Sequence, residues 1–419
     1  MYQKFYQRVT LGMIALGLLA LGAWSTSAQD SAPSSSPAPA KQDPPADLSG
    51  AAKAGEFVNM SDEEVLRSVR TSELDECIAA SLKTLAGYQR PDGSFGMPST
   101  ITATSSLAGM AFLASGSTPT SGPYAKQIRD VMEFLLLAQD TNTGFICEKN
   151  DTNSAIHGHG FATMFLASCY GHLDPRDAKQ MKIALDLAVK CSVGGQTRHG
   201  GWGYYPDKLT FDEGSTTVCV LQGIRAARDA GISVDKSVIA NAMDYLSKTK
   251  ERVNFRSPKK GHRGESYEGY TFKYSLASGS SNHSWALVAA ACSSLNNIGV
   301  YSGYGSWDKQ SLTRVLHGGM RYLYHHSDDF FERYDKGQHS LDTGHFPYSI
   351  FYATQAFWQY NNRTYFMDFF PTVRDHLLKS WRAGGKRGFT KASYGPVYAT
   401  AFCLLTLQLP YQYLPAFQR

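Results

Sequence analysis

The sequence repeats one helical pattern six times, and this periodicity constrains the fold more than any other feature. Segments with apolar residues at helical spacing begin near residues 74, 124, 177, 235, 307 and 365. The first of them places Leu74, Ile78, Leu82 and Leu85 on one face of a helix. The starts are separated by 50, 53, 58, 72 and 58 residues. A pattern that recurs at such a period predicts a repeat architecture.

Each amphipathic segment is followed by a turn and by a second segment of small and apolar residues. The second segments cover residues 102–115, 155–170, 216–230, 282–296, 347–359 and 396–409. A helix that is apolar or small on every side is buried on every side. The sequence therefore predicts an all-α, six-fold α/α toroid with inner and outer rings of six helices each, and an open helical solenoid is the alternative. We expect Ser99-Thr100 and Ser215-Thr216 to cap helix starts.

The turns between the paired segments carry a motif. Residues 89–95 (QRPDGSF) and 196–202 (QTRHGGW) both read Gln-x-x-x-Gly-x-aromatic, and residues 139–145 are a looser copy. The motif resembles the Gln–Trp repeats of squalene and terpenoid cyclases and the Gly–aromatic repeats of protein prenyltransferase β subunits. This resemblance covers about residues 74–410 and implies the same toroid fold. It also implies a central cavity that holds an isoprenoid-type molecule.

The residues that carry the chemistry of those families are absent. The resemblance implies an Asp-x-Asp-Asp acid for a cyclase and Asp, Cys and His zinc ligands for a prenyltransferase. The nearest acidic pair is Asp212-Glu213, just before the third buried segment. The nearest substitute for the zinc ligands is the group Cys147, Asp151, His157 and His159. We expect no metal and no cofactor, and the sequence leaves open whether the protein is an enzyme.

Candidate ligand-binding residues gather where the buried segments begin. Four histidines lie at or just before these starts, where free helix N–H groups favour a polar or anionic group. Aromatic side chains on the later buried segments could line a central funnel. Histidines that merely cap helix ends, and aromatics that merely fill the core, are the alternative interpretation. The candidate funnel and rim residues are His157, His159, Trp202, Asp212, Glu213, His283, Trp285, His345, Tyr352, Trp358, Tyr394 and Tyr398.

The N-terminus has the features of a secretory signal peptide. Lys4 and Arg8 precede an uncharged apolar run of 14 residues, and Thr26-Ser27-Ala28 provides small residues for cleavage. A membrane-spanning helix needs about 20 residues, so the run is short for an anchor. We expect a signal peptide at 1–28, a disordered Ser/Pro/Ala-rich linker at 29–60 and the toroid at 61–419. The protein is expected to be periplasmic or extracellular, with membrane contact only through this segment or an uncleaved anchor.

Composition narrows the function further. The chain is 42% hydrophobic with a net charge of +5 over 419 residues, which excludes a disordered chain and indicates no nucleic-acid partner. The basic segment 248–263 is expected to be a solvated loop. The sequence predicts an exported binding or scaffold protein with a central funnel for an elongated apolar, isoprenoid-type ligand. The alternatives are a cyclase- or prenyltransferase-like enzyme with displaced catalytic residues and a glycan-processing toroid enzyme.

Overall fold

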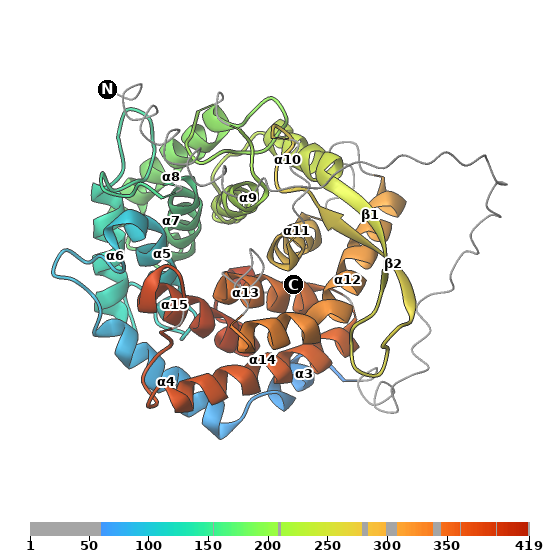
Figure 1. Cartoon of the computed structure of the whole chain (residues 1–419). Coiled ribbons are helices and arrows are strands. Elements are labelled where there is room, and N and C mark those ends of the chain that lie inside the picture. Colours follow the sequence, from blue (N-terminus) through green and yellow to red (C-terminus); the bar gives the residue numbers. More distant parts are fainter. Residues whose placement is uncertain are drawn as a thin grey trace, which may run out of the picture. The chain divides into compact units, whose positions relative to one another are not determined.

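The computed structural model describes residues 60–417, apart from 154, 208–210, 279–283, 299–307, 338–344, 361 and 391. These residues contain thirteen α-helices and a single two-stranded sheet (Figure 1). The chain is therefore mostly helical, as the sequence predicts. The predicted signal peptide, all but the last residue of the predicted linker, and His283 lie outside the described residues.

All twelve predicted helices are present, and each begins within three residues of its predicted start. The amphipathic helices are α4 (Ser72–Ala86), α6 (Ala125–Leu137), α8 (Pro175–Gly195), α10 (Lys236–Thr249), α12 (Lys309–Asp335) and α14 (Arg363–Ala383). The buried helices are α5 (Ile101–Leu113), α7 (Ala155–Tyr170), α9 (Gly214–Asp229), α11 (Trp285–Ile298), α13 (Phe346–Gln359) and α15 (Gly395–Gln408). An additional helix, α3 (Asp62–Ser68), precedes them and begins with a capping box formed by Ser61 and Glu64. Short 3₁₀ helices are η1 (Pro98–Thr100), η2 (Leu409–Tyr411) and η3 (Pro415–Phe417).

The buried helices contact one another in chain order. Helix α5 contacts α7, α7 contacts α9, and the series continues through α11 and α13 to α15, which contacts α5 again. Each amphipathic helix packs on the buried helix that precedes or follows it, and α4 packs on α15. Figure 1 shows the buried helices in the middle with the amphipathic helices around them. None of the helices in the described part of the chain is long and apolar enough to span a membrane.

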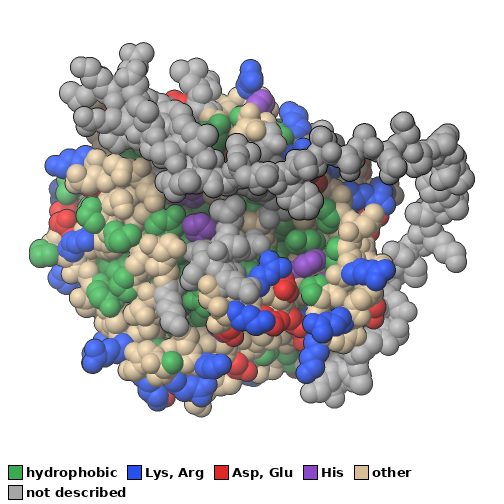
Figure 2. Space-filling model, viewed as in Figure 1, with side chains coloured by type: hydrophobic (Ala, Val, Ile, Leu, Met, Phe, Trp, Pro, Cys, Tyr) green, Lys and Arg blue, Asp and Glu red, His purple; other side chains and the backbone are tan. Residues whose placement is uncertain are grey.

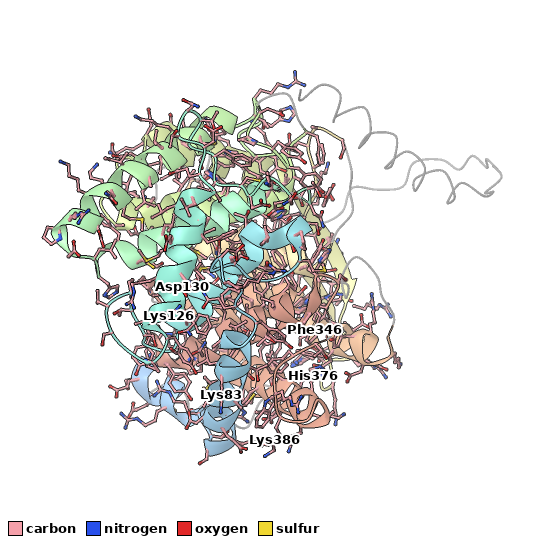
Figure 3. The ribbon with its side chains drawn as sticks, turned by 90° about the vertical axis from the view of Figure 1, so that its left-hand side faces the viewer. Lys83, Lys126, Asp130, Phe346, His376 and Lys386 are labelled. Atoms are coloured by element: carbon pink, nitrogen blue, oxygen red, sulfur yellow. The ribbon has the colours of Figure 1, made fainter. Side chains whose placement is uncertain are left out.

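The amphipathic helices have the charged outer face that their sequence predicts. In α6, Ile128, Val131 and Leu135 are fully buried, whereas Lys126 and Asp130 form an exposed ion pair one turn apart. Figure 3 shows this pair on the surface of α6. Figure 2 shows Lys and Arg side chains interspersed with Asp and Glu on the face that it presents. The surface charge of the described residues is thus mixed in sign on that face.

Small residues allow the buried helices to approach closely. A Cβ atom added to Gly160 of α7 would lie 2.7 Å from the backbone carbonyl of Cys219 in α9. A Cβ atom added to Gly109 of α5 would lie 2.5 Å from the Phe165 ring of α7. Because no larger side chain fits at these positions, the Ala- and Gly-rich composition of the buried helices is a packing requirement.

The Gln-x-x-x-Gly-x-aromatic turns are stability devices that recur with the same geometry. Gln196 donates from Nε2 to the carbonyl oxygens of Gly200, in its own turn, and of Val238, in helix α10. Gln89 and Gln139 make the same pair of bonds to their own turns and to the next amphipathic helix. Each glutamine therefore fastens one repeat to the next.

Two helix starts are capped differently from the prediction. The Thr100 side chain makes no capping hydrogen bond, and the N–H of Thr102 is instead bound by Asp151 from the next repeat at 3.0 Å. Ser215 and Thr216 lie inside the first turn of α9, and the cap is Glu213, whose side chain accepts both of their backbone N–H groups. The prediction failed because both caps are carboxylates outside the small Ser/Thr pairs.

The prediction of a solvated loop for the basic segment 248–263 was wrong, because this segment belongs to a β-hairpin. Strands β1 (Lys250–Arg256) and β2 (Ser266–Phe272) pair antiparallel, with Lys250 opposite Phe272 and Arg256 opposite Ser266. The hairpin packs on α12 through β2. Lys259 in its turn is buried and forms ion pairs with Asp328 at 2.9 Å and Asp368 at 3.1 Å. The hairpin also explains the long step of 72 residues between the fourth and fifth amphipathic segments.

Candidate functional site

The candidate residues that start the buried helices lie at several separate places in the chain. His157 and His159 are the third and fifth residues of α7, and Trp285 is the first residue of α11. His345 and Tyr394 are the N-cap residues of α13 and α15. Asp212 and Glu213 immediately precede α9.

Four of the candidate residues pack between a buried helix and an amphipathic helix. His159 is fully buried, accepts the N–H of Ile146 at Nδ1 and contacts Ser192 of α8 through Nε2. Trp202 donates to the Ser192 carbonyl oxygen, and Trp285 donates to the Leu323 carbonyl oxygen of α12. Trp358 packs edge-on against Phe366 of α14. Burial lowers the pKa of His159 to about 4, so this imidazole is neutral at pH 7.

Asp212 holds the segment after the hairpin against the start of α9. Its Oδ1 accepts the N–H groups of Leu276 at 2.8 Å and Ala277 at 3.2 Å, and its Oδ2 is bonded to His199. Burial alone would raise the pKa of this carboxyl, but the bonds from His199 and the two amides outweigh it and lower the pKa. Asp212 is therefore a charged, fully bonded structural group.

Glu213 begins a chain of three side chains that crosses from α9 to α7. Its Oε2 accepts the hydroxyl of Ser215 at 2.7 Å, and the same hydroxyl lies 2.8 Å from Nε2 of His157. Glu213 is 1% exposed, while Ser215 and His157 are partly exposed. Burial raises the pKa of Glu213, although the bonds from Ser215 and Thr216 oppose the shift. Two candidate residues, His157 and Glu213, are thus brought together through Ser215, which sequence reasoning assigned only to capping.

Two tyrosines flank this chain. The carbonyl oxygen of Tyr204 accepts the N–H of Ile156, next to His157, and the carbonyl oxygen of Tyr274 accepts the N–H of Gly214, next to Ser215. The two tyrosine hydroxyls are hydrogen-bonded to each other. Burial, followed by the charge of Glu213, raises the pKa of both phenols, so they remain protonated donors.

Polar side chains from α9 and α13 meet between the buried helices. The Tyr352 hydroxyl donates to Oε1 of Gln222 at 3.1 Å and lies 3.7 Å from Sγ of Cys219. Gln355, in turn, accepts the Ser293 hydroxyl of α11 at 3.1 Å. All five residues are buried. Helices α9 and α13, which are not neighbours in the series of buried helices, are therefore joined by these buried side chains.

Aromatic rings form a continuous series along α15 and across to α7. Tyr394 stacks with His345 at a centroid distance of 5.8 Å and contacts Tyr398 at 5.2 Å. Tyr398 contacts Phe402 at 4.9 Å, and Phe402 contacts Phe161 of α7 at 6.0 Å. We call these five side chains, His345, Tyr394, Tyr398, Phe402 and Phe161, the aromatic ladder.

Tyr348 of α13 adjoins the ladder through Phe402, at a centroid distance of 6.0 Å. Its side chain is 8% exposed, and its hydroxyl has no hydrogen-bond partner among the described residues. A buried hydroxyl without a partner carries a desolvation cost of about 1–3 kcal/mol. It is therefore a natural contact for a polar group of a bound molecule. No sequence signal distinguished Tyr348 from the other tyrosines of the buried helices.

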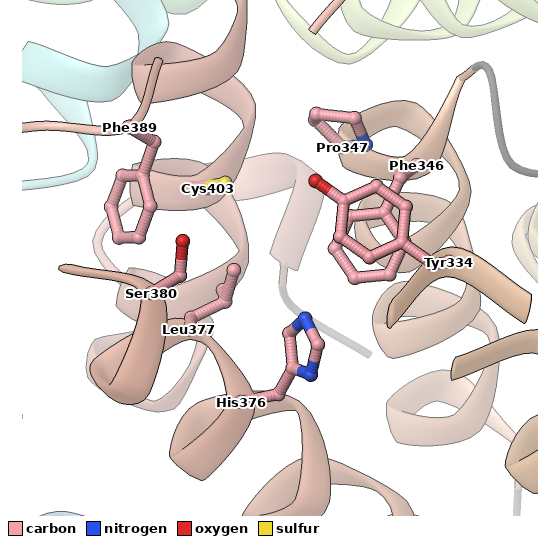
Figure 4. Close-up of a pocket in the computed structure, with 8 residues that line it drawn as sticks. All are labelled: Tyr334, Phe346, Pro347, His376, Leu377, Ser380, Phe389 and Cys403. Carbon is pink, nitrogen blue, oxygen red and sulfur yellow. The ribbon is translucent and has the colours of Figure 1, made fainter. Parts of the chain in front are cut away.

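A small pocket lies elsewhere, between α12, α13, α14 and α15 (Figure 4). Figures 3 and 4 show Phe346 and His376 here, on different helices. The pocket contains none of the twelve candidate residues; it is lined by Tyr334, Phe346, Pro347, His376, Leu377, Ser380, Phe389 and Cys403.

No group of three or more His, Cys, Asp and Glu side chains among the described residues could hold a metal ion. His157 and His159, which the sequence suggested as substitutes for zinc ligands, point to different partners, Ser215 and Ser192. Neither imidazole is directed at Cys147, whose thiol faces the carbonyl oxygens of Glu148 and Asp151.

No protein-family model matches the chain, and no curated protein is significantly similar to it.

Proposed function

We propose that α4 to α15 form a six-fold α/α toroid that binds an elongated, largely apolar ligand of isoprenoid type. The fold proposal is supported by the closed series of contacts, in which α15 packs on α5, and by the three matching glutamine turns. Gln408 of α15 donates to the Ala111 carbonyl oxygen of α5 at 3.0 Å, so a hydrogen bond joins the last buried helix to the first.

The aromatic ladder is the observation that carries the ligand proposal. It runs from the partly exposed ring of Tyr394 at the start of α15 to the buried rings of Phe402 and Phe161. Aromatic faces bind apolar chains and unsaturated groups through dispersion and burial of surface. The polar groups near the helix starts, His157, Ser215 and Tyr348, suit a hydroxyl or another polar end group.

We propose further that the protein is exported and acts outside the cytoplasm. The charged start, the 14-residue apolar run and the small residues before position 29 support this. Mass spectrometry of the protein from its own host tests the proposal, because a cleaved protein begins at Gln29. An uncleaved N-terminus at Met1 would contradict cleavage and would indicate an anchor.

Isothermal titration calorimetry with geranylgeraniol tests the binding function. We expect binding by the full chain and a loss of about tenfold or more in affinity for Tyr398→Ala, since each 1.4 kcal/mol of lost contact is tenfold. Tyr398→Phe should retain affinity if the ring, rather than the hydroxyl, makes the contact. Tyr88→Ala is the matched control, because Tyr88 is 41% exposed and lies outside the ladder. Absence of binding, or equal losses in Tyr398→Ala and Tyr88→Ala, would refute the ligand proposal.

A further inference from the structure

Ser215 is held between a carboxyl group and an imidazole, and helix capping requires only the first of these. The start of α12 shows an ordinary cap for comparison. There the Ser311 hydroxyl donates to Asp308 at 2.6 Å, and Asp308 accepts the Ser311 N–H at 2.8 Å. Ser215 and Glu213 form the same motif at α9, with a hydroxyl bond of 2.7 Å and an N–H bond of 3.0 Å. His157 is the additional group at Ser215, and it comes from a different helix.

The position of His157 Nε2 suits proton transfer. Its distance of 2.8 Å from Ser215 Oγ is within the range in which a general base removes a hydroxyl proton. Oε2 of Glu213, 2.7 Å from the same hydroxyl, holds Ser215 Oγ in place beside the imidazole, and the hydroxyl proton can rotate from the carboxylate to Nε2 of His157. The hydrogen-bonded pair Tyr204 and Tyr274 lies beside the site, because the two backbone carbonyl oxygens bind the N–H groups of Ile156 and Gly214.

We propose that Ser215 is the nucleophile of an ester-cleaving site, with His157 as its general base and Glu213 as a positioning residue. Ser215 Oγ forms a bond to the ester carbonyl carbon while its proton passes to Nε2 of His157. The ester C–O bond then breaks, and His157 returns the proton to the leaving alcohol. Water attacks the acyl-serine in the same manner, so that ester and water become acid and alcohol.

The substrate class follows from the proximity of the aromatic ladder. The ring of Tyr204 lies 6.5 Å from that of His157. Burial raises the pKa of Tyr204, and Tyr394 of the ladder is close enough to raise it further, although less than burial does. The site takes an ester whose acyl or alcohol part is apolar, and this part of the inference rests on the proposed binding of an apolar molecule by the aromatic ladder. The nucleophile itself rests only on the contacts among His157, Ser215 and Glu213.

A decyl fluorophosphonate tests the nucleophile without knowledge of the natural substrate. Serine attack forms an O–P bond and releases fluoride, with the proton taken by the base. We expect one adduct per chain in the intact mass of the full-length protein, and peptide mapping should place it on Ser215. Ser215→Ala should form no adduct, and His157→Gln should react about 100-fold more slowly, since a general base contributes at least that factor.

Ser311→Ala is the matched control, because Ser311 has the same carboxylate cap without a histidine. It should be labelled at the wild-type rate. The proposal is overturned by a wild-type protein that forms no adduct, by an adduct on another serine, or by equal rates for His157→Gln and wild type. Mapping on the wild-type protein decides the site even if Ser215→Ala does not fold. Tyr398→Ala separates the two proposals: it should lose affinity for geranylgeraniol, and it should still form the adduct on Ser215 because the contacts among His157, Ser215 and Glu213 remain.

Discussion

Single glycines carry the closest backbone contacts between repeats. Gly93, Gly144 and Gly200 all have positive φ, and a Cβ atom on them would lie 2.3, 2.1 and 2.0 Å from a carbonyl oxygen of the next amphipathic helix. The glycine therefore serves two purposes, the left-handed turn and the close approach. Its motif was visible in the sequence, but the neighbouring helix that makes it necessary was not.

Comparison of Gly200→Ala with Gly231→Ala should distinguish the cost of the left-handed backbone from the cost of the close approach. Both positions have positive φ, but a Cβ atom on Gly231 has nothing within 4 Å. We expect Gly231→Ala to lower the free energy of unfolding by about 1 kcal/mol from backbone strain alone. Gly200→Ala adds a clash with Asn241 and should cost at least about 3 kcal/mol. Urea unfolding monitored by circular dichroism measures both, and equal losses would show that close approach is unimportant.

Asp151 gives the stability a dependence on pH. It is 5% exposed, and burial raises its pKa to about 6 despite its bond to the N–H of Thr102. Because the folded pKa exceeds the unfolded value of about 3.9, the favourable contribution of this group is present at low pH and is lost as the pH rises through 6. Between pH 7 and pH 5 it should grow by about 1 kcal/mol.

Asp151→Asn should remove this dependence and still accept the N–H of Thr102. The measurement is the unfolding free energy of wild type minus that of the variant, at pH 7 and at pH 5. We expect the difference to move in favour of wild type at pH 5. An identical difference at both values would mean that Asp151 has the same pKa in the folded and unfolded chain.

The site was only partly predictable at this scale. The sequence placed His157 and Glu213 among the candidates because both lie at the start of a buried helix. It gave no sign that Ser215 would lie between them, since His157 and Ser215 are 58 residues apart and meet only because α7 packs on α9. Trp285 and Trp358 were expected in a funnel because buried aromatics look alike in a sequence. Only packing shows that they contact α12 and α14.

At the scale of elements, the glutamine turns are the fasteners between repeats. Gln196→Ala removes two hydrogen bonds, of 2.8 and 2.9 Å, and leaves the Val238 carbonyl oxygen without this donor. We expect a loss of about 1–3 kcal/mol in unfolding free energy. Gln180→Ala, at an exposed position of α8, is the control and should change stability by no more than about 0.5 kcal/mol. Similar values for the two variants would refute the fastening role.

The helices could be predicted from the sequence and the hairpin could not, because helical periodicity is local whereas the hairpin depends on contacts with distant segments. Helical periodicity is a local property, and it survives in each of the twelve segments whatever their neighbours are. The strands β1 and β2 have weak alternation, with Val253 and Phe255 set among charged residues. They are stabilised by packing on α12 and by the ion pairs of Lys259, which lie far away in the sequence.

For the molecule as a whole, the closed series of helix contacts predicts tolerance of circular permutation. Helix α3 packs near η2, and α4 packs on α15, so the two ends of the described chain meet. In the permuted protein, a short Gly/Ser linker joins residue 417 to residue 60, and the new termini lie at the exposed Ser121-Gly122. We expect it to fold and to have a similar urea midpoint of unfolding. The same linker inserted at Ser121-Gly122 of the unpermuted chain is the control. Loss of cooperative unfolding only in the permutant would favour an open array.

Each of the seven cysteines is a free thiol, and six of them are buried. In the oxidising surroundings that export would bring, the native packing shields the six buried thiols. Once the chain unfolds, an odd number of thiols becomes available for non-native disulfide formation. These disulfides then prevent refolding. The lifetime of the protein outside the cell would consequently be set by how rarely it unfolds, and a reductant would restore reversibility in the test tube.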